Sequence, residues 1–591
     1  MVELDYGDAL SHGRVERARH LTEGNMALLV LVDSSGPYHN RNIVDETILV
    51  ALEHFGMPYR LLDLAQQRPS AELLAGCAGL VIAQAGLGDS LAEEESQLIA
   101  DAVAEGMGLV NFDGDLWRYR GPLLEVFGFR GVERLPYASN LILVPSNEHY
   151  ITWLQEPRAF HESRRMVTAV MVKEWRDDVE VLAEAVLGKE QLIYIRHLVP
   201  GNAYVPKHYP IIFAARWGEG RAVQWLMNPR LWRAGALGHL GGLDDLFWRG
   251  IVWAVRKPFV ANMIPPFVTM SFDDCSGRHD FRYLDISAGY GYTPLVSIFL
   301  DNIREKDRPI LRGKAEAGEI LINTHGWDYY KLHYYDFGVE DYSEEQVRRL
   351  FQQEDEFYRW LGVNPCHTAV CHYGDMGVRS LPYLKQRRRT FIRTPTHVGV
   401  RRADQCLTDA GGGYWPYDST ARFYDYLPDD NDFYIFGCFN VRHLADFLTG
   451  ATLSLRESPF NDIEKAAERA ASQLRNGLGD GFFADVLTHE QKLGVLTLQE
   501  WDRILARTAE KTSRFEKIFS QHDDIAAYLK SKDGTWLARI EGLNGGVRCA
   551  LSGRAERPLR LSLFVDVDGG AERRYVDVLA FEGQIEVETF L

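Results

Sequence analysis

Short apolar runs alternate with amphipathic stretches along most of the chain. After a polar arm at residues 1–25, helical patterns cover residues 42–55, 92–104 and 243–256. Apolar patterns typical of strands lie at residues 27–32, 59–63, 79–83, 107–112, 141–145, 190–197, 210–215 and 221–227. Strands that alternate with helices favour a parallel, doubly wound sheet. We therefore expect an α/β domain over residues 26–258.

A second series of strand patterns follows the proline-rich segment 257–266, which we interpret as a domain boundary. Each is a short apolar run that ends in a polar residue and a loop. The seven runs lie at residues 267–272, 294–299, 319–324, 367–371, 390–393, 433–437 and 482–487. Helical patterns fall between several of them, and those that begin at Ser343 and Thr497 start with capping boxes. This order predicts an incomplete (β/α)7 barrel over residues 265–520, with functional residues at the carboxyl ends of its strands.

The helical pattern stops near residue 525. Alternating segments at 535–540, 559–564 and 575–579 then predict antiparallel strands. We expect a small β-sandwich-like domain over residues 525–591, and a sheet packed on the barrel is the alternative. The predicted fold class is thus α/β, with a flavodoxin-like first domain, a central barrel and a small β domain.

Charge and composition narrow the classes of partner. The 591-residue chain has a formal net charge of −18, which argues against nucleic acid as its main partner because phosphate binding needs a basic face. Its seven cysteines are irregularly spaced and form no Cys-x-x-Cys motif, so we interpret them as reduced thiols. No run approaches the ~20 apolar residues that span a bilayer, and the first residues lack the pattern of a signal peptide. We expect a cytoplasmic protein that binds neither nucleic acid nor membranes. If it forms homo-oligomers, we expect the first domain to make the contact.

Polar residues at the ends of the barrel strands form the candidate site. Asp273 and Asp274 end the first strand, and two adjacent carboxylates repel each other unless a cation or a shared proton intervenes. Because neighbours on a strand point in opposite directions, a turn must begin here for both to reach one site. A plain turn or helix cap is the alternative interpretation. His325 leaves the third strand in a position suited to an imidazole ligand, and His489 ends the last strand, where it could protonate a departing amine or alcohol.

Three segments together resemble the motifs of the polysaccharide deacetylase superfamily of carbohydrate esterases. Ser271-Phe-Asp-Asp274 resembles the first motif, Thr324-His-Gly326 the second and Leu487-Thr-His489 the last. The resemblance covers about 230 residues and depends more on the order of the motifs than on any one of them.

The resemblance implies a residue for each role. Asp273 would be the general base, Asp274 and His325 metal ligands, and His489 the general acid. The cofactor would be a divalent metal, most often zinc, which activates water and polarises the acetyl carbonyl. The substrate would be an acetylated saccharide, and the products acetate and a free amine or hydroxyl.

The chain departs from the pattern of the family at two places. Tyr329 stands where the second motif usually supplies another histidine, and the arginine and proline of the third motif are missing. His372 or Arg393 is the candidate for orienting the base instead. For the third metal ligand we favour His333, which the loop after Gly326 can bring back if it is extended. His279 is the second choice, and a site without a third ligand is the remaining alternative.

The aromatic residues after His325, among them Trp327 and Tyr329, fit a sugar-binding loop and equally a loop packed on the barrel rim. A catalytically degenerate carbohydrate-binding or scaffold protein is a second hypothesis, favoured by the missing histidine. A glycoside hydrolase is a third, but it needs two carboxylates ~5–10 Å apart across a sugar, which adjacent aspartates do not suit.

The first domain, with its segment 238–253, resembles the glutamine-amidotransferase-like accessory domain of some bacterial beta-galactosidases. An active amidotransferase of this fold needs a cysteine on a sharp turn from strand to helix. Cys77 lies before the strand at 79–83 instead. We therefore interpret this domain as structural or ligand-binding.

Overall fold

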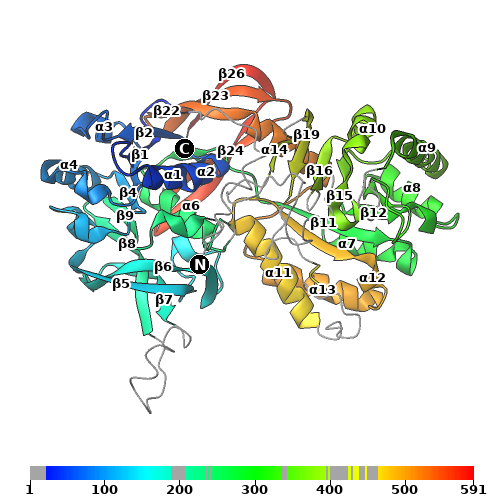
Figure 1. Cartoon of the computed structure of the whole chain (residues 1–591), viewed down its shortest axis with the longest axis horizontal. Coiled ribbons are helices and arrows are strands. Elements are labelled where there is room, and N and C mark those ends of the chain that lie inside the picture. Colours follow the sequence, from blue (N-terminus) through cyan, green and yellow to red (C-terminus); the bar gives the residue numbers. More distant parts are fainter. Residues whose placement is uncertain are drawn as a thin grey trace, which may run out of the picture.

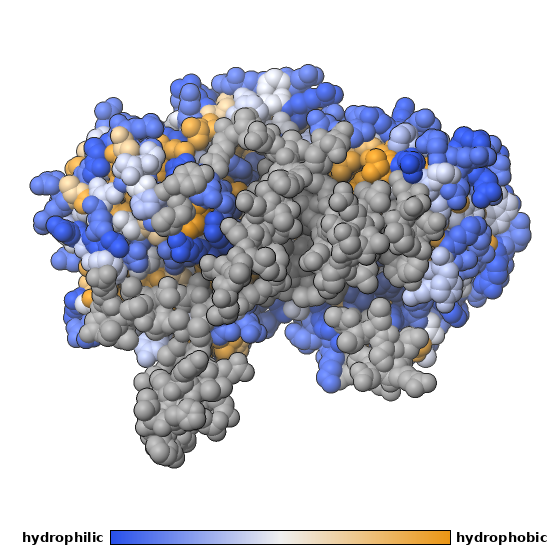
Figure 2. Space-filling view, in the orientation of Figure 1, coloured by the Kyte–Doolittle hydropathy of each residue, from blue (hydrophilic) through white to orange (hydrophobic). Residues whose placement is uncertain are grey.

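Two lobes and a set of C-terminal strands make up the protein (Figure 1). The computed structural model describes residues 21–187, 207–233, 236–239, 241–334, 342–393, 397–398, 424–427, 430–437, 446–448 and 463–590. Hydrophilic residues dominate the outline of both lobes in the view of Figure 2, as expected when the apolar strands lie inside. None of the helices in these ranges is long and apolar enough to cross a membrane. The α/β class is confirmed.

The first lobe is built on a nine-stranded sheet with the order β2-β1-β3-β4-β9-β8-β7-β5-β6. Its parallel half consists of β1 (Leu28–Val32), β2 (Tyr59–Asp63), β3 (Gly79–Ile82), β4 (Gly108–Asn111) and β9 (Gly220–Trp225). Its antiparallel half consists of β8 (Lys207–Trp217), β7 (Glu180–Leu187), β5 (Phe129–Val144) and β6 (Ala159–Trp175). The helices are α1 (Tyr38–Glu46), α2 (Ile48–His54), α3 (Ala71–Ala75), α4 (Glu93–Ala104), α5 (Leu123–Val126) and α6 (Asp244–Ala254).

The expectation of a parallel sheet is therefore right for half of the strands. Helices separate β1, β2, β3 and β4 along the chain, and these strands are parallel. The other strands pair antiparallel: β5 lies between β6 and β7 and runs antiparallel to both, and β8 runs antiparallel to β7 and β9. No helix separates β8 from β9, so the chain turns back directly between them. The strand expected at 190–197 lies outside the described residues.

The second lobe contains all seven strands expected of the barrel. They are β11 (Phe267–Cys275), β12 (Leu295–Phe299), β13 (Leu321–Gly326), β14 (Thr368–Ala369), β16 (Phe391–Arg393), β19 (Asp430–Phe436) and β20 (Ala484–His489). They form two sheets, β13-β12-β11-β20 and β14-β16-β19, and β18 (Tyr424–Leu427) extends the second sheet antiparallel to β19. Asn323, in the middle of β13, bonds the backbone of Val370 after β14, and this contact joins the two sheets. Short pairings of β15 (Asp375–Met376) with β17 (His397–Val398) and of β21 (Ile518–Phe519) with β11 complete the strands.

Helices cover the outside of these strands (Figure 1). They are α7 (Arg282–Gly289), α8 (Arg308–Glu316), α9 (Glu344–Leu361), α10 (Leu381–Gln386), α11 (Ile463–Gly479), α12 (Glu490–Leu493) and α13 (Leu498–Lys511). The two expected capping boxes are present, at Ser343 before α9 and at Thr497 before α13.

The C-terminal region differs from its expectation. A further helix, α14 (His522–Asp533), crosses the point where we expected helices to stop. Ile525, Ala526 and Leu529 form one face of this helix and are buried with Phe482 and Tyr434 of the barrel lobe. The spacing of these three apolar residues is typical of the buried face of a helix, so it could have predicted α14 from the sequence.

The strands after α14 do not form a β-sandwich of their own. They are β22 (Thr535–Leu543), β23 (Gly546–Ala555), β24 (Leu559–Val567), β25 (Gly570–Val578) and β26 (Phe581–Phe590). β22, β23 and β26 form one sheet, whereas β24 pairs with β25 and with β10 (Phe259–Ala261). Their apolar residues share one continuous core with the first lobe.

Candidate active site

The end of β11 is distorted where the two adjacent aspartates lie. The register of β11 against β12 shifts between Phe272 and Cys275, and Asp274 has a left-handed backbone with φ of 59°. Such a conformation costs about 1–3 kcal/mol in a residue other than glycine and persists only where the surroundings hold it. The break in the strand lets both carboxylates contact groups at the carboxyl ends of the strands of the second lobe, as the sequence required. We call this end of the lobe the barrel mouth. Both side chains are buried.

Three donor atoms meet at this mouth. Asp274 Oδ1 lies 3.3 Å from His325 Nε2 and 3.2 Å from His372 Nδ1, and the two ring nitrogens lie 3.1 Å apart. Without a cation, both imidazoles would have to donate an N–H group to Asp274 Oδ1. The two N–H groups would then lie side by side, with their nitrogens 3.1 Å apart, and would repel each other. Tetrahedral zinc with ligand bonds of ~2.0–2.1 Å separates its ligand atoms by about 3.3 Å. The three residues therefore fit a divalent ion of this size.

Neighbouring groups hold these donors in place. Gln491 Nε2 donates a 2.7 Å hydrogen bond to Asp274 Oδ2, and His372 Nε2 lies 3.2 Å from the carbonyl oxygen of Tyr329. Contacts of this kind fix the orientation of metal ligands. Burial opposes ionisation of Asp274, but the two histidines beside it hold the pKa of its carboxyl well below the usual range. His325 Nδ1 is buried and has no hydrogen-bond partner within the described part of the chain.

Arg393, rather than His372, contacts the expected base. Its Nη1 lies 3.6 Å from Asp273 Oδ1, and its Nε donates a 3.1 Å hydrogen bond to Asp485 Oδ2. Asp485 also accepts from Ser271 Oγ at 2.9 Å and lies 3.1 Å from His522 Nε2, so the guanidinium is anchored from below. Burial raises the pKa of Asp273, but the guanidinium and the nearby histidines outweigh it and hold the pKa below its usual value. Asp273 is therefore ionised and can accept a proton.

The expected acid lies on the neighbouring strand. β20 runs parallel to β11, and the register pairs His489 with Asp273. His489 Nδ1 lies 2.8 Å from Asp446 Oδ2. Burial lowers the pKa of His489, but the hydrogen bond to Asp446 and its charge raise it to about 9. The ring is therefore protonated at neutral pH and can donate a proton.

Sequence reasoning did not single out Asp446. It lies in a short described segment, 446–448, that belongs to no strand or helix. Thr488 Oγ1 donates a 2.9 Å hydrogen bond to its Oδ1, so Asp446 contacts both of the last two residues of β20. Nothing in the spacing of the sequence links it to His489.

The structure brings neither of the two favoured third ligands to the mouth. His333 Nε2 lies 3.2 Å from Glu354 Oε2, and Glu354 also pairs with Arg389. The loop after Gly326 does turn back, since Trp327 N donates to Lys331 O at 2.9 Å. The turn carries the Tyr329 carbonyl to His372 and leaves His333 packed against Trp327 and Phe351 in the interior.

His279 is also turned away from the site. Its Nε2 lies 2.9 Å from the carbonyl oxygen of Leu493. His372, which we had expected only as an orienting residue, lies in the third position instead. Tyr329 presents its backbone there and keeps its ring half-exposed at 38%.

Cys77 lies outside any catalytic arrangement in the first lobe. Its side chain is fully buried, and its Sγ contacts Leu74 O at 3.3 Å. Burial raises the pKa of this thiol to about 11, which disfavours the thiolate that an amidotransferase needs.

Comparisons with known proteins give partial likenesses. No family model matches the chain, and no curated protein matches it. A protein from Mycobacterium smegmatis described as a candidate polysaccharide deacetylase is 13% identical, with a TM-score of 0.33, and the match covers 49% of this chain and 99% of that one. A CE4 esterase from Streptococcus mutans is 14% identical, with a TM-score of 0.24 and coverages of 43% and 86%. A T48 deacetylase with substrate is 14% identical, with a TM-score of 0.25 and coverages of 44% and 90%. These comparisons do not support the amidotransferase-like resemblance of the first lobe.

Proposed function

We propose that the protein is a metal-dependent hydrolase that removes acetyl groups, bound through nitrogen or oxygen, from a carbohydrate. The observation that carries the proposal is the triangle of Asp274 Oδ1, His325 Nε2 and His372 Nδ1, with sides of 3.1–3.3 Å. An ionised carboxylate and a protonated imidazole stand beside it on adjacent strands.

Asp274, His325 and His372 would hold the metal, for which zinc is the leading candidate. One carboxylate and two imidazoles are a common ligand set for catalytic zinc, which keeps a further position open. A bound divalent ion would polarise the acetyl carbonyl and make water a stronger nucleophile at neutral pH.

The other residues move the protons. Asp273, held ionised by Arg393, accepts a proton from the water that attacks the acetyl carbon. His489, held protonated by Asp446, donates a proton to the nitrogen or oxygen of the sugar as its bond to the acetyl carbon breaks. The oxygen of the water then belongs to acetate, and the nitrogen or oxygen of the sugar has gained a proton.

Metal analysis and acetate release test the proposal on the full chain. Protein purified without a chelator should contain about one divalent ion per chain and should release acetate from a panel of acetylated oligosaccharides. Asp273→Asn is the matched control, because it removes the base and keeps the three ligands, so it should retain the metal and release no acetate.

Three results would contradict this proposal. If chelator-treated protein releases acetate as fast as untreated protein, the metal is not needed. If the metal binds and no acetate appears, a carbohydrate-binding protein without catalysis is favoured. New reducing ends in place of acetate would indicate a glycoside hydrolase.

A further inference from the structure

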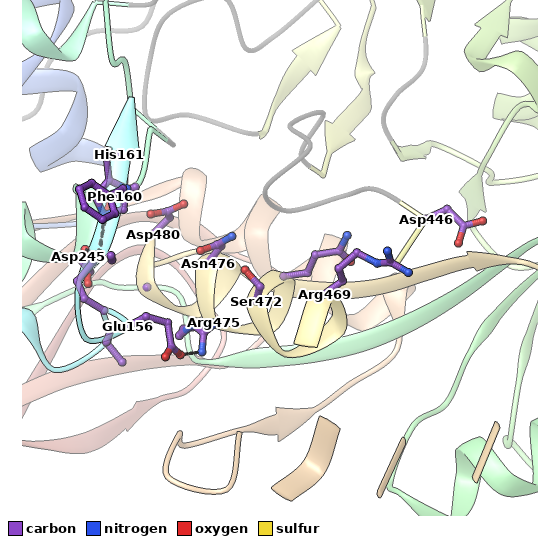
Figure 3. A pocket seen from close by; sticks show the side chains of 16 residues that line it. Glu156, Phe160, His161, Asp245, Asp446, Arg469, Ser472, Arg475, Asn476 and Asp480 are labelled. Carbon is purple, nitrogen blue, oxygen red and sulfur yellow. Dashed lines mark hydrogen bonds and ion pairs between the residues drawn. The ribbon is translucent and has the colours of Figure 1, made fainter. Parts of the chain in front are cut away.

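A cavity of about 450 Å³ lies between the two lobes. The first lobe contributes Gln155, Phe160, His161 and Asp245 to its walls, and the barrel lobe contributes Asp446 and residues of α11 (Figure 3). Neither lobe encloses the cavity alone, so both lobes form its walls.

One face of α11 forms the floor of the cavity. Arg469, Ser472, Asn476 and Asp480 line it and follow one another at intervals of three and four residues, which places them on one side of the helix and its end (Figure 3). At 1.5 Å per residue, the stretch from Arg469 to Asp480 is about 16 Å long. This length is that of a short chain of sugars and exceeds that of a single one.

One end of the cavity reaches Asp446, the residue that contacts the proposed acid. Asp446 lines the cavity, and its carboxylate also contacts His489 Nδ1 at 2.8 Å. A general acid must stand beside the leaving group, and in deacetylation the leaving group is the sugar. Because Nδ1 is bonded to Asp446, the departing sugar would lie at His489 Nε2, and the cavity adjoins the acid through Asp446.

The other end carries the buried carboxyl group of Asp245, whose pKa burial and the charge of Asp480 raise to about 8. Asp245 is 2% exposed, and its Oδ1 accepts a 2.7 Å hydrogen bond from Gln155 Nε2. Its Oδ2 is buried without a hydrogen-bond partner among the described residues. Leaving a buried polar atom unpaired costs about 1–3 kcal/mol, so a ligand with a hydroxyl group would gain by reaching it.

The lining favours a polyhydroxylated ligand over an anionic one. The walls carry the carboxylates of Asp446, Asp480 and Glu156 and the carboxyl group of Asp245, against the guanidinium groups of Arg469 and Arg475. Arg475 is paired with Glu156, and Arg469 donates to the carbonyl oxygens of Phe447 and Leu448. The phenyl ring of Phe160, which is 53% exposed, adds an apolar face of the kind that can pack on a sugar ring.

We propose that this cavity binds the saccharide chain of the substrate where it extends away from the acetyl group that is removed. The inference rests on the proposed function, because it takes the sugar as the group that departs past His489. It gives the first lobe a role as one wall of the binding site for the substrate.

Binding of oligosaccharides of increasing length tests the proposal. The probes are N-acetylglucosamine oligomers and O-acetylated xylose oligomers of one to six sugars, titrated calorimetrically into the full-length Asp273→Asn protein so that nothing is consumed. We expect affinity to rise by at least about tenfold between two and five sugars. Ser472→Trp, which fills the cavity from α11, should abolish that rise. Asn476→Ala, a milder change of the same face, should reduce it if the tryptophan variant does not fold.

Two controls separate this proposal from the proposed function. Glu464→Gln, on the same helix but outside the cavity and paired with Arg507, should leave the rise unchanged. Hydrolysis of 4-nitrophenyl acetate, which is too short to reach the cavity, should be unaffected by Ser472→Trp in the protein with Asp273 intact.

The outcomes are distinct. Affinity that does not depend on length, or a dependence that survives both cavity variants, overturns the cavity proposal even if acetate is released. A dependence lost in the cavity variants while no acetate forms on any probe supports the cavity as a saccharide site and overturns the proposed hydrolysis.

Discussion

Replacing His372 by alanine should break the metal site while the fold survives. His372 follows β14, 47 residues after His325, and its Nδ1 completes the triangle with Asp274 and His325. The alanine variant leaves two ligands. His372 is buried, but it lies at the barrel mouth and belongs to none of the apolar clusters that form the cores.

The size of the loss follows from the number of ligands. Structural zinc sites bind with about 10–16 kcal/mol through four ligands, which is roughly 2.5–4 kcal/mol for each. Since ~1.4 kcal/mol is a factor of ten, removing one ligand should weaken zinc binding by about 100- to 1,000-fold. Acetate release at limiting zinc should fall by the same factor.

The measurement is a zinc titration of chelator-treated protein in competition with a chromogenic chelator, with circular dichroism to verify the fold. His333→Gln is the matched control, because His333 is also buried and contacts a carboxylate, Glu354, but no donor of the triangle. Its zinc affinity should remain within about threefold of that of the unaltered protein, since it is not bonded to any ligand. Equal zinc affinity in His372→Ala and the unaltered protein would refute the reasoning, as would an equal loss in His333→Gln.

Three further variants test the proton transfers and the first lobe. Asp446→Asn removes the charge that raises the pKa of His489 to about 9, so the alkaline limit of kcat should move to lower pH; an unchanged profile would exclude His489 as the acid. Arg393→Lys weakens the contact that holds the pKa of Asp273 down, so the acidic limit of kcat/KM should move to higher pH while the metal content stays the same. Loss of the metal from this variant would show that Arg393 supports the metal ligands instead. Cys77→Ser should leave the rate of acetate release within about twofold of that of the unaltered protein, because the buried thiol touches neither the mouth nor the cavity. If the unaltered protein hydrolyses glutamine and this variant does not, the amidotransferase interpretation is restored.

The strands of the barrel could be predicted because each is a short apolar run that ends in a polar residue. Phe267 to Phe272 are buried or half-buried in β11, and the pattern breaks at Asp273, where the site begins. The same reasoning predicted that the chain must turn between the two aspartates, and the left-handed backbone of Asp274 is that turn. The positions of these strands and of the turn can be predicted from a short stretch of sequence, because consecutive residues form a strand and its end.

The third donor could not be predicted in the same way. Which histidine completes the triangle depends on how the loop after Gly326 folds back, and that loop is positioned by Glu354 and Arg389 from other elements. Thr324, just before His325, contacts Glu354, and Arg389 bonds Asn323 and Tyr334. These contacts bury His333 and leave the mouth to His372. Partners so far apart in the sequence leave no periodic signal.

The seam between the lobes is fixed by buried hydrogen bonds, which bears on how the cavity can work. His54 Nε2 lies 3.0 Å from Asp480 O, and Trp248 Nε1 donates to Gly479 O at 2.8 Å. Both bonds tie the first lobe to the end of α11, beside the cavity floor. Because breaking a buried hydrogen bond leaves polar groups unpaired at a cost of about 1–3 kcal/mol each, the two walls of the cavity are held at a set separation. A saccharide chain would then enter a cavity already shaped for it, and its affinity would depend on the side chains that line the walls rather than on a closing movement of the lobes.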